Sequence, residues 1–404
     1  MNQTKILWIS MFAPVSVAPS AGSQTFNFYF KQFLNDDDFQ LRIISCGKPK
    51  EREATEKELQ SIEHYIIYWP QSTKEKFKNF VNIESKYNLF NRNAGLISNS
   101  DSAKILKKAK EWKREGYNPD VVILEWTNMV VLAKEIKRLF PNSKIVASEH
   151  DVTFVGYERC ISYYSGIRRL VWKVKYHWEK KKELEALSIC DLVLPHNADN
   201  GVVLIKNGID ISRIHGLVPY YHNMGTCQRR SNYRDLLFFG AMARPENSLS
   251  AIWFIEKVMP RITDLDIRFV ILGSNPPDSL KAYENDRVVI TGFVDSIEPF
   301  FQKSMCLVAP LVLGAGIKVK ILEALSSGIP VLTNDIGIEG IPAKNNEDYY
   351  HCSTPEEYEQ VIRKLVDHRI DEKRLGENAH DLIKKEFDLL SAYGNYKNWI
   401  GELR

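Results

Sequence analysis

The sequence predicts an α/β protein of two doubly wound domains, each a parallel sheet covered by helices. Three observations support this. The 404 residues suit two domains of ordinary size. Continuous apolar runs alternate with amphipathic stretches, as in parallel sheets buried on both faces. The alternation breaks once, over the polar stretch 205–232, and then restarts. The predicted domains are 1–215 and 216–385, with a C-terminal helix over 386–404 that crosses back to the first domain.

In the first domain, Val/Ile/Leu-rich runs predict strands, and residues 50–100, which are polar and aromatic, predict irregular helices and loops. The acidic run 35–39 precedes a strand and is interpreted as a solvated turn. A helix is expected near 23–35. Strands are predicted over 5–11, 41–46, 120–126, 144–150 and 191–196.

In the second domain, a helix is expected to start at Asn247. Ligands of doubly wound sheets bind beyond the carboxyl ends of the strands. The loops that follow the strands, and the cleft expected between two such domains, are therefore the predicted site. Strands are predicted over 236–242, 267–273, 288–294, 305–311 and 330–334.

Composition excludes several classes of protein. A net charge of +3 is too small to indicate a nucleic-acid partner. Residues 1–195 hold 30 Lys+Arg against 23 Asp+Glu, and residues 196–404 hold 24 against 28. This asymmetry permits contact of the first half with anionic lipid, and ordinary surface variation explains it equally well. Six scattered cysteines without a C-x-x-C pair indicate a reducing compartment. The N-terminal apolar run is too short for a secretory signal, and no apolar run reaches 18 residues, so a cytoplasmic protein is expected.

The stretch "LGAGIKVKILEALSSGIPVL" follows the strand 305–311. Its glycines Gly314 and Gly316 allow a tight turn, and a helix is expected to begin near Ile317. Lys320 and Glu323 share a face near the first turns, where the amide groups of the helix favour an anion. A nucleotide diphosphate beside a ribose would suit this layout. A surface ion pair on an ordinary helix explains the spacing too.

Lys318 projects about 160° away from Lys320 around such a helix and is expected to be solvated.

A longer stretch, "FFGAMARPENSLSAIWFIEKVMPRI … IRFVILGS … VVITGFVDSIEPFFQKSMCLVAPLVLGAGIKVKILEALSSGIPVLTNDIGIEGI" (236–341), resembles the C-terminal domain of retaining glycosyltransferases of family 4, glycosyl transferases group 1. The first domain resembles that family more loosely, through an early glycine loop, "EH" after a strand, and "CDLVLPHN". The resemblance implies the GT-B fold, in which two Rossmann-like domains face each other across a cleft that holds a nucleotide-sugar donor.

The resemblance also implies roles for residues. Glu323 matches the second glutamate of the family's E-x7-E motif, which holds the donor ribose, and Lys320 would meet the diphosphate. Catalytic roles are expected for His150, Lys320 and Arg244. The residues expected to border the donor are Gly22, Gly240, Arg244, Thr291, Phe293, Val294, Gly314, Ala315, Gly316, Ile317, Lys320, Glu323 and Glu339.

Two departures from the family pattern stand out. The first glutamate of E-x7-E would fall at Ala315, so a carboxylate near the donor sugar is missing. Many relatives carry an arginine and a lysine after the first strand of this domain. Here Arg244 is followed by Asn247 and Ser248 instead.

His150 ends a predicted strand at the cleft, where family members place a histidine beside the donor sugar. A structural histidine that closes the strand is the alternative. Strand alternation sends Glu149 and Asp151 to the other face. Glu125 and Asn128 lie at another strand end, where they would meet an acceptor.

Two further loops border the predicted cleft. The loop around Gly22 would bring amides to the diphosphate or to the acceptor. Glu339 is either a contact for donor hydroxyls or an ordinary loop charge.

Residues 163–187 interleave aromatic residues with Arg, Lys and His. As a helix this segment would suit an anionic membrane beside a lipid-linked acceptor. The favoured interpretation is a long helix that packs its Leu/Val/Trp stripe on the sheet.

The predicted function is a retaining, hexosyltransferase-type glycosyltransferase that moves a sugar from a UDP- or GDP-sugar to a hydroxyl of a sugar, lipid-linked or protein-linked acceptor. Glycan, polysaccharide or glycolipid biosynthesis is the expected setting. No bound metal, no cofactor and no nucleic-acid partner is expected. Peripheral contact with an anionic membrane at its inner face is left open beside the favoured interpretation of 163–187 as a packed helix. The alternatives are a nucleotide-sugar 2-epimerase and a catalytically silent GT-B protein that binds a nucleotide as a scaffold.

Overall fold

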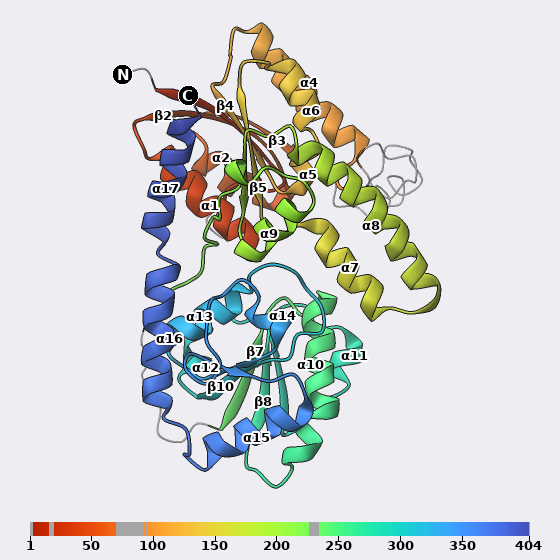
Figure 1. Ribbon diagram of the computed structural model, residues 1–404, viewed down its shortest axis with the longest axis vertical. Coiled ribbons are helices and arrows are strands. Elements are labelled where there is room, and N and C mark those ends of the chain that lie inside the picture. Colours follow the sequence, from red (N-terminus) through yellow and green to blue (C-terminus); the bar gives the residue numbers. More distant parts are fainter. Residues whose placement is uncertain (1–2, 16–19, 70–92, 94, 226–233, 404) are drawn as a thin grey trace. The chain divides into compact units, whose positions relative to one another are not determined.

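The computed structural model describes residues 3–15, 20–69, 93, 95–225 and 234–403. The chain divides into two compact units. Unit 1 comprises Met1–Tyr220 with Leu389–Arg404, and unit 2 comprises Tyr221–Asp388. Each is built on a six-stranded parallel sheet with helices beside it (Figure 1). The predicted α/β class is confirmed.

The sheet of unit 1 has the order β3-β2-β1-β4-β5-β6. Its strands are β1 Thr4–Ser10, β2 Phe39–Gly47, β3 Glu63–Tyr68, β4 Val121–Glu125, β5 Lys144–Glu149 and β6 Leu192–Pro195. Its helices are α1 Ala21–Leu34, α2 Arg52–Glu58, α4 Asn99–Arg114, α5 Thr127–Val130, α6 Ala133–Leu139, α7 Thr153–Tyr163, α8 Gly166–Leu187, α9 Ala198–Lys206 and α17 Leu389–Glu402, with short 3-10 turns η1 Pro49–Glu51 and η2 Ile211–Arg213.

The two faces of this sheet carry separate cores, because successive strand side chains point to opposite sides. On one face Trp8 packs edge-on against Phe26, Phe30 and Phe33 of α1, with ring centroids 5.5–5.7 Å apart. The buried ring of Tyr396 from α17 lies 5.0 Å from Phe33 and closes this core. The core of the other face receives residues from α4, α6, α8 and α9.

The carboxyl ends of the central strands of unit 1 are aligned. Ser10 pairs with Glu125, Glu125 pairs with Ser148, and Glu149 pairs with Pro195. The strand order reverses beside β1, so residues that follow β1, β4, β5 and β6 gather at the edge where doubly wound sheets bind ligands.

The sheet of unit 2 has the order β12-β11-β10-β7-β8-β9. Its strands are β7 Asp235–Phe239, β8 Arg268–Leu272, β9 Val288–Gly292, β10 Ser304–Ala309, β11 Val331–Thr333 and β12 Tyr350–His351. Its helices are α10 Pro245–Lys257, α11 Asp278–Lys281, α12 Glu298–Phe301, α13 Val319–Ser327, α14 Asp335–Ile338, α15 Pro355–Val366 and α16 Glu372–Glu386, with the 3-10 turn η3 Met259–Ile262.

Three helices begin elsewhere than predicted. Helix α1 begins at Ala21, because Ser20 is its N-cap and accepts from the Ser23 amide. Helix α10 begins at Pro245, a residue suited to the first helical position, and not at Asn247. Helix α13 begins at Val319 and not near Ile317.

The acidic run 35–39 is largely an exposed turn, as predicted, in which the half-buried Asp36 accepts 2.6 Å hydrogen bonds from Lys397 and Tyr393 of α17. One prediction about exposure in unit 1 is wrong. The apolar stripe of α8 does not pack on the sheet but is exposed, as Leu170 and Val174 show with 63% and 60% exposure. Strand β3 also lies in the range 50–100, where only irregular structure was predicted. No helix among the described residues has both the length and the hydropathy to cross a bilayer.

Candidate functional site

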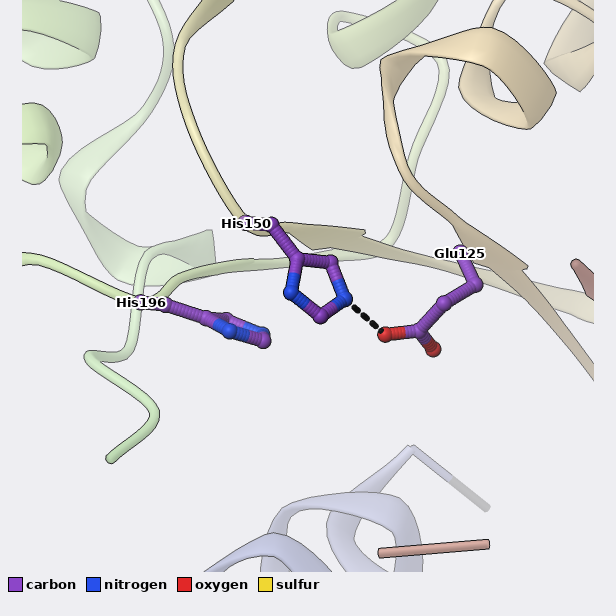
Figure 2. A group of neighbouring side chains, drawn as sticks. All are labelled: Glu125, His150 and His196. Carbon is purple, nitrogen blue, oxygen red and sulfur yellow. Dashed lines mark hydrogen bonds and ion pairs between the residues drawn. The ribbon is translucent and has the colours of Figure 1, made fainter. Parts of the chain in front are cut away.

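Three side chains from neighbouring strand ends of unit 1 meet in one cluster (Figure 2). Glu125 is the last residue of β4, His150 follows β5 and His196 follows β6. His150 Nε2 lies 2.7 Å from Glu125 Oε1, and the two imidazole centroids are 4.1 Å apart. The side chains of Glu125 and His150 are 3% and 8% exposed, so little water competes for their hydrogen bonds.

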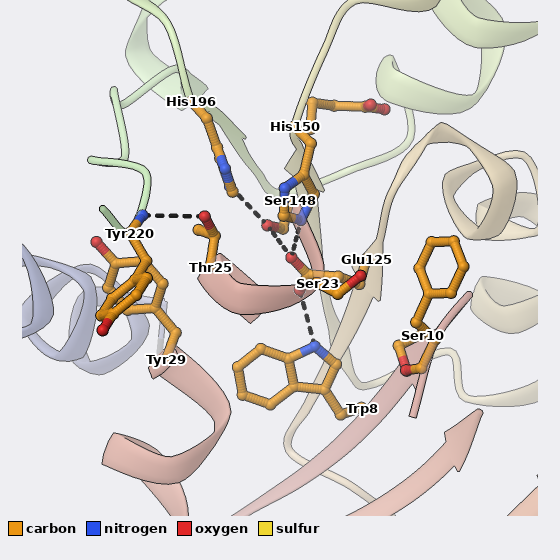
Figure 3. A network of polar contacts seen from close by, with 12 residues as sticks. Trp8, Ser10, Ser23, Thr25, Tyr29, Glu125, Ser148, His150, His196 and Tyr220 are labelled. Carbon is orange, nitrogen blue, oxygen red and sulfur yellow. Dashed lines mark hydrogen bonds and ion pairs between the residues drawn. The ribbon is translucent and has the colours of Figure 1, made fainter. Parts of the chain in front are cut away.

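A chain of hydrogen bonds connects this cluster to the sheet (Figure 3). Trp8 Nε1 donates to Glu125 Oε2 at 2.9 Å, and Ser148 Oγ donates to Glu125 Oε1 at 2.7 Å. His196 Nε2 lies 3.1 Å from Ser148 Oγ. Since the Ser148 proton goes to Glu125, His196 Nε2 is the donor in that pair.

The same reasoning assigns the tautomer of His150. With Glu125 ionised, His150 Nε2 carries a proton and donates it to the carboxylate, which leaves Nδ1 as an acceptor. Burial lowers the pKa of His150 to about 3, and burial also lowers the pKa of His196 well below its ordinary value. Both imidazoles are therefore neutral near pH 7. Burial raises the pKa of Glu125 to about 7, against the hydrogen bonds from Ser148 and Trp8 that favour its ionised form.

Gly22 controls access to that acceptor. Gly22 was predicted to lie in the loop before the helix, but it lies in the first turn of α1. A Cβ at this position would lie 3.2 Å from His150 Nδ1 and 3.3 Å from Trp126 Nε1. Trp126 stacks on the imidazole of His150, with centroids 4.4 Å apart and planes at 11°. The backbone φ of Trp126 is 68°, a conformation that bulky residues rarely adopt. Strained backbone of this kind is often found at functional sites.

The cluster also has the composition of a metal site, because Glu125, His150 and His196 offer ligand atoms within 4.8 Å of one another. Hydrogen bonds already engage both carboxylate oxygens of Glu125 and Nε2 of both histidines. The absence of a bound metal stays a prediction.

The other polar residues predicted near this edge have structural partners. Glu149 is buried on the opposite face and accepts a 2.6 Å hydrogen bond from Thr127 Oγ1. Asn128 Nδ2 donates to the Leu96 carbonyl at 2.5 Å. Asp151 is exposed. Glu125, one of the two residues predicted to meet an acceptor, is the partner of His150, and its contact with an acceptor stays a prediction.

In unit 2, Lys320 lies in the first turn of α13 and is held from two sides. Its Nζ donates to Asn247 Oδ1 at 2.7 Å and lies 4.4 Å from the centroid of the Phe238 ring. Gly240, after β7, makes this arrangement possible. With φ of 152°, a Cβ there would lie 2.8 Å from Asn247 Nδ2 and 3.0 Å from Lys320 Nζ.

The pKa values of Lys320 and Glu323 are shifted in the direction that favours the neutral form of each side chain. Burial, followed by the nearby cations Arg244 and Lys318, lowers the pKa of Lys320 to about 7. Burial raises the pKa of Glu323 to about 7, although the His222 amide donates to Glu323 Oε1 at 3.5 Å. An anionic group beside Lys320 would favour the charged form of that lysine, and hydroxyl groups that donate to Glu323 would favour its ionised form.

Lys318 is not solvated, so that prediction is wrong. Its side chain is 11% exposed, its Nζ donates to the Gly316 carbonyl and lies 3.3 Å from Glu339 Oε2. Lys318 is the N-cap of α13 with extended backbone (φ −92°, ψ 97°), so the angular spacing of a helix does not apply to it. Glu339, proposed for donor hydroxyls or as a loop charge, is a 9% exposed partner of this lysine.

The remaining predicted donor residues lie in loops at the carboxyl ends of unit 2 strands. Arg244 is the N-cap of α10, and its Nη2 lies 3.5 Å from Glu246. Phe293 follows β9 and is 74% exposed. The loop around Ala315 holds no acidic residue between β10 and α13. The other residues of this set are Thr291, Val294, Gly314, Gly316 and Ile317.

Several site residues escaped the sequence analysis: Trp8, Trp126, Ser148, His196 and Phe238. Asn247 was noted there only as a departure from the family pattern, without its contact with Lys320. His196 had a usable signal, because it follows its strand just as His150 does. The others act through contacts between residues far apart in the chain.

Residues 233–368, about a third of the chain, match the family described as "Glycosyl transferases group 1". An uncharacterized 44.6 kDa protein in the cps region of Klebsiella pneumoniae is 23% identical over 172 residues, which cover 40% of this chain and 44% of that protein. The chain thus spans less than half the length of this curated relative.

Solved structures match almost the whole chain. Anabaena HepE in complex with UDP and glucose is 12% identical with a TM-score of 0.67, over 99% of this chain and 100% of that one. Sucrose-phosphate synthase from Thermosynechococcus elongatus is 13% identical with a TM-score of 0.70, over 99% of both chains. Two parallel six-stranded sheets in one chain, and these matches, define the GT-B fold of glycosyltransferases.

Proposed function

We propose that this protein is a glycosyltransferase that moves a sugar from a UDP- or GDP-sugar to a hydroxyl acceptor. The observation that carries the proposal is the group formed by Lys320, Asn247 and Glu323. A cation and a carboxylate one turn apart, both with pKa values shifted to about 7, lie at the N-terminal half of one helix. The likeness to a structure that holds UDP and glucose supports a nucleotide-sugar donor.

The roles follow from charge and position. Lys320, Arg244 and the first amides of α13 would stabilise the diphosphate as it leaves, through donors already fixed in place. Glu323 would accept hydrogen bonds from the ribose hydroxyls. Thr291, Phe293 and Val294 would border the base. In unit 1, His150 Nδ1 would accept a hydrogen bond from a hydroxyl of the donor sugar.

The stereochemical course is the finer part of the proposal. Ala315 offers no carboxylate, and neutral His150 is held by Glu125. A front-face attack, in which the leaving phosphate accepts the proton of the acceptor hydroxyl, needs no protein nucleophile and would retain the anomeric configuration. No metal is required by this scheme.

The acceptor is a sugar, lipid-linked or protein-linked hydroxyl, in glycan, polysaccharide or glycolipid biosynthesis. A cytoplasmic location with peripheral contact at the inner face of the membrane would suit a lipid-linked acceptor.

A catalytically silent nucleotide-binding protein is the second candidate, favoured by Ala315. A nucleotide-sugar 2-epimerase would use the same donor without an acceptor.

A thermal-shift screen of UDP-, GDP-, ADP- and TDP-sugars tests the donor site, since a ligand that binds the folded state raises Tm. The matched variants are Lys320→Met and Lys344→Met, of which only the second changes an exposed lysine side chain. We expect one sugar nucleotide to raise Tm of the wild type and of Lys344→Met, but not of Lys320→Met. No shift with any donor would contradict the proposal.

The bound donor is then followed by NMR. Transfer to added acceptors or slow donor hydrolysis supports a transferase. Epimerised donor without acceptor identifies the epimerase, and binding without turnover identifies the silent protein.

A further inference from the structure

Helix α8 presents an apolar stripe to the solvent. Five of its side chains, which we call the α8 stripe, are between 45% and 83% exposed. They are Ile167, Leu170, Val171, Val174 and Trp178. A monomeric protein seldom exposes a contiguous apolar surface without a use for it.

The spacing places the stripe on one side of α8 and the packed residues on the other. At about 100° per residue, the five side chains of the stripe span an arc of about 100°. The opposite side of α8 packs against α7. Trp172 lies 5.0 Å from Tyr157 and Tyr176 lies 6.3 Å from Phe154, between ring centroids. The stripe is therefore not a core face displaced from its partner, because that helix already has a packed face.

Cations border the stripe on both sides. On the helical wheel Arg168, Lys175 and Lys182 follow one edge and Lys173 lies beyond the other, whereas Lys181 falls within the arc of the stripe, one turn after Trp178. Residues 166–182 contain two arginines and five lysines, and their one acidic residue, Glu179, is buried on the packed side. The exposed Glu185, near the end of α8, lies 3.9 Å from Lys181 and from Lys182 and offsets part of the positive charge there.

We propose that the α8 stripe and its bordering cations dock this protein on the surface of a bilayer that contains anionic phospholipid. An interfacial helix buries an apolar face, often with a tryptophan, at the level of the head groups and pairs its cations with their phosphates. A second copy of this chain fits less well, because two such faces would bring like charges together. An acidic protein partner would complement the charge of the cations, but its charge would not account for the exposed apolar side chains of the stripe.

This inference deepens the proposed function, because it names the surface that would make the peripheral membrane contact, although docking itself needs neither donor nor acceptor. Its consequence is positional. Unit 1 would be held at the surface where the head group of a lipid-linked acceptor lies.

Co-sedimentation of the full chain with vesicles tests the docking. The vesicles are phosphatidylcholine alone, or phosphatidylcholine with phosphatidylglycerol, at low and high salt. We expect at least tenfold tighter binding to the anionic vesicles at low salt, weakened at high salt. Equal binding to both vesicles, or binding to neither, would overturn the proposal.

Two sets of variants separate the contributions. The stripe variant Leu170→Ser/Val174→Ser should lose at least tenfold in binding, and the charge variant Lys173→Gln/Lys175→Gln/Lys182→Gln should lose its preference for anionic vesicles. The controls change equally exposed residues elsewhere: Ile211→Ser/Leu390→Ser, with wild-type exposures of 68% and 70%, and Lys344→Gln/Lys373→Gln. Controls that lose as much as the test variants would contradict the assignment.

Two further measurements keep the outcomes distinct. The thermal shift with the sugar nucleotide should be unchanged in every variant, so a loss of vesicle binding is not a loss of fold or donor site. Mass measurement by light scattering tests the rival occupant. If the wild type is a dimer and the stripe variant is a monomer, the α8 stripe binds a second copy of the chain and the membrane proposal is overturned.

Discussion

Nζ of Lys320 donates a 2.7 Å hydrogen bond to Oδ1 of Asn247, although the two residues lie 73 positions apart in the chain. Asn247 stands where many relatives carry a lysine, and its side chain has a contact of its own at that position. It orients the remaining lysine, and Gly240 leaves the space in which the two side chains meet.

Lys320→Met should weaken donor binding and transfer at least tenfold, because it removes the cation from the proposed diphosphate site and keeps an unbranched side chain beside Phe238. Stability should not fall. The pKa of Lys320 is lowered on folding, so the charged form is disfavoured in the folded state and its removal costs nothing electrostatically. Isothermal titration with the sugar nucleotide, together with Tm, measures both effects. Unchanged affinity would remove Lys320 from the donor site.

Donor affinity should have a maximum near pH 7. Lys320 has a pKa of about 7 in the protein, and a diphosphate raises it, so affinity falls as pH rises above about 7. Ribose hydroxyls favour ionised Glu323, which also has a pKa of about 7, so affinity falls as pH drops below that value. Binding is measured from pH 5.5 to 9 by titration, a range set around these values.

The two limbs belong to different residues. Lys320→Met should remove the alkaline limb, and Glu323→Gln the acid limb, with at least a tenfold loss of transfer for each. A profile that neither variant alters would refute the assignment of both residues.

Glu125→Gln should impair transfer through His150. An amide at this position can donate to His150 Nε2, which favours the tautomer with the proton on Nδ1 and so removes the acceptor. We expect a loss of about tenfold in kcat at near-normal KM, which is the size expected when one hydrogen bond to the reacting sugar is lost. NMR of the imidazole nitrogens reports the tautomer directly. A purely structural role would lower Tm without changing the His150 signals.

Gly22→Ala should lower transfer at least tenfold, because its Cβ would press on His150 Nδ1 and on the stacked Trp126 ring. Gly394→Ala is the matched control. Gly394 lies in α17 with no heavy atom within 4 Å of an added Cβ, so alanine there should stabilise the helix by up to about 1 kcal/mol. Equal activity of both variants would mean that His150 tolerates displacement.

Glu149→Gln should stabilise the protein at alkaline pH. Burial, and then the charge of Glu183, raise the pKa of Glu149 well above 4.5, and burial raises that of Glu183 to about 8. Carboxyl groups with raised pKa values bind more protons in the folded state, so stability falls as pH rises from about 4.5 to 8.

The variant lacks one of these groups, so its Tm should exceed that of the wild type by several degrees at pH 8.5 and match it at pH 5. Glu115→Gln, at an exposed position, should follow the wild type. If Tm of Glu149→Gln and Tm of the wild type changed with pH in the same way, the raised pKa of Glu149 would be contradicted.

The fold was predictable from the sequence because the central strands are continuous apolar runs with helices between them. Strand β3, "EHYIIY", was not, since among the described residues it pairs with β2 alone, at an edge, and it mixes polar and aromatic residues. The lysine and glutamate of α13 could be found from their spacing. The partners Asn247, Phe238 and Trp8 could not, because only folding brings them there.

Helical periodicity also misled in two places. It assigned Lys318 a direction that an N-cap does not follow. It identified the stripe of α8 correctly, but an amphipathic pattern does not say whether protein or another apolar phase covers the apolar side.

The last helix, α17, completes the aromatic core that begins with β1 and α1. Tyr396 packs on Phe33 and Tyr29, and Lys397 holds Asp36. During synthesis, the ribosome must finish residues 221–388 before this core can close. The aromatic core of unit 1 therefore stays uncovered while the residues of unit 2 are synthesised. Fragments that stop before Leu389 should aggregate, whereas residues 221–388 carry a complete sheet of their own.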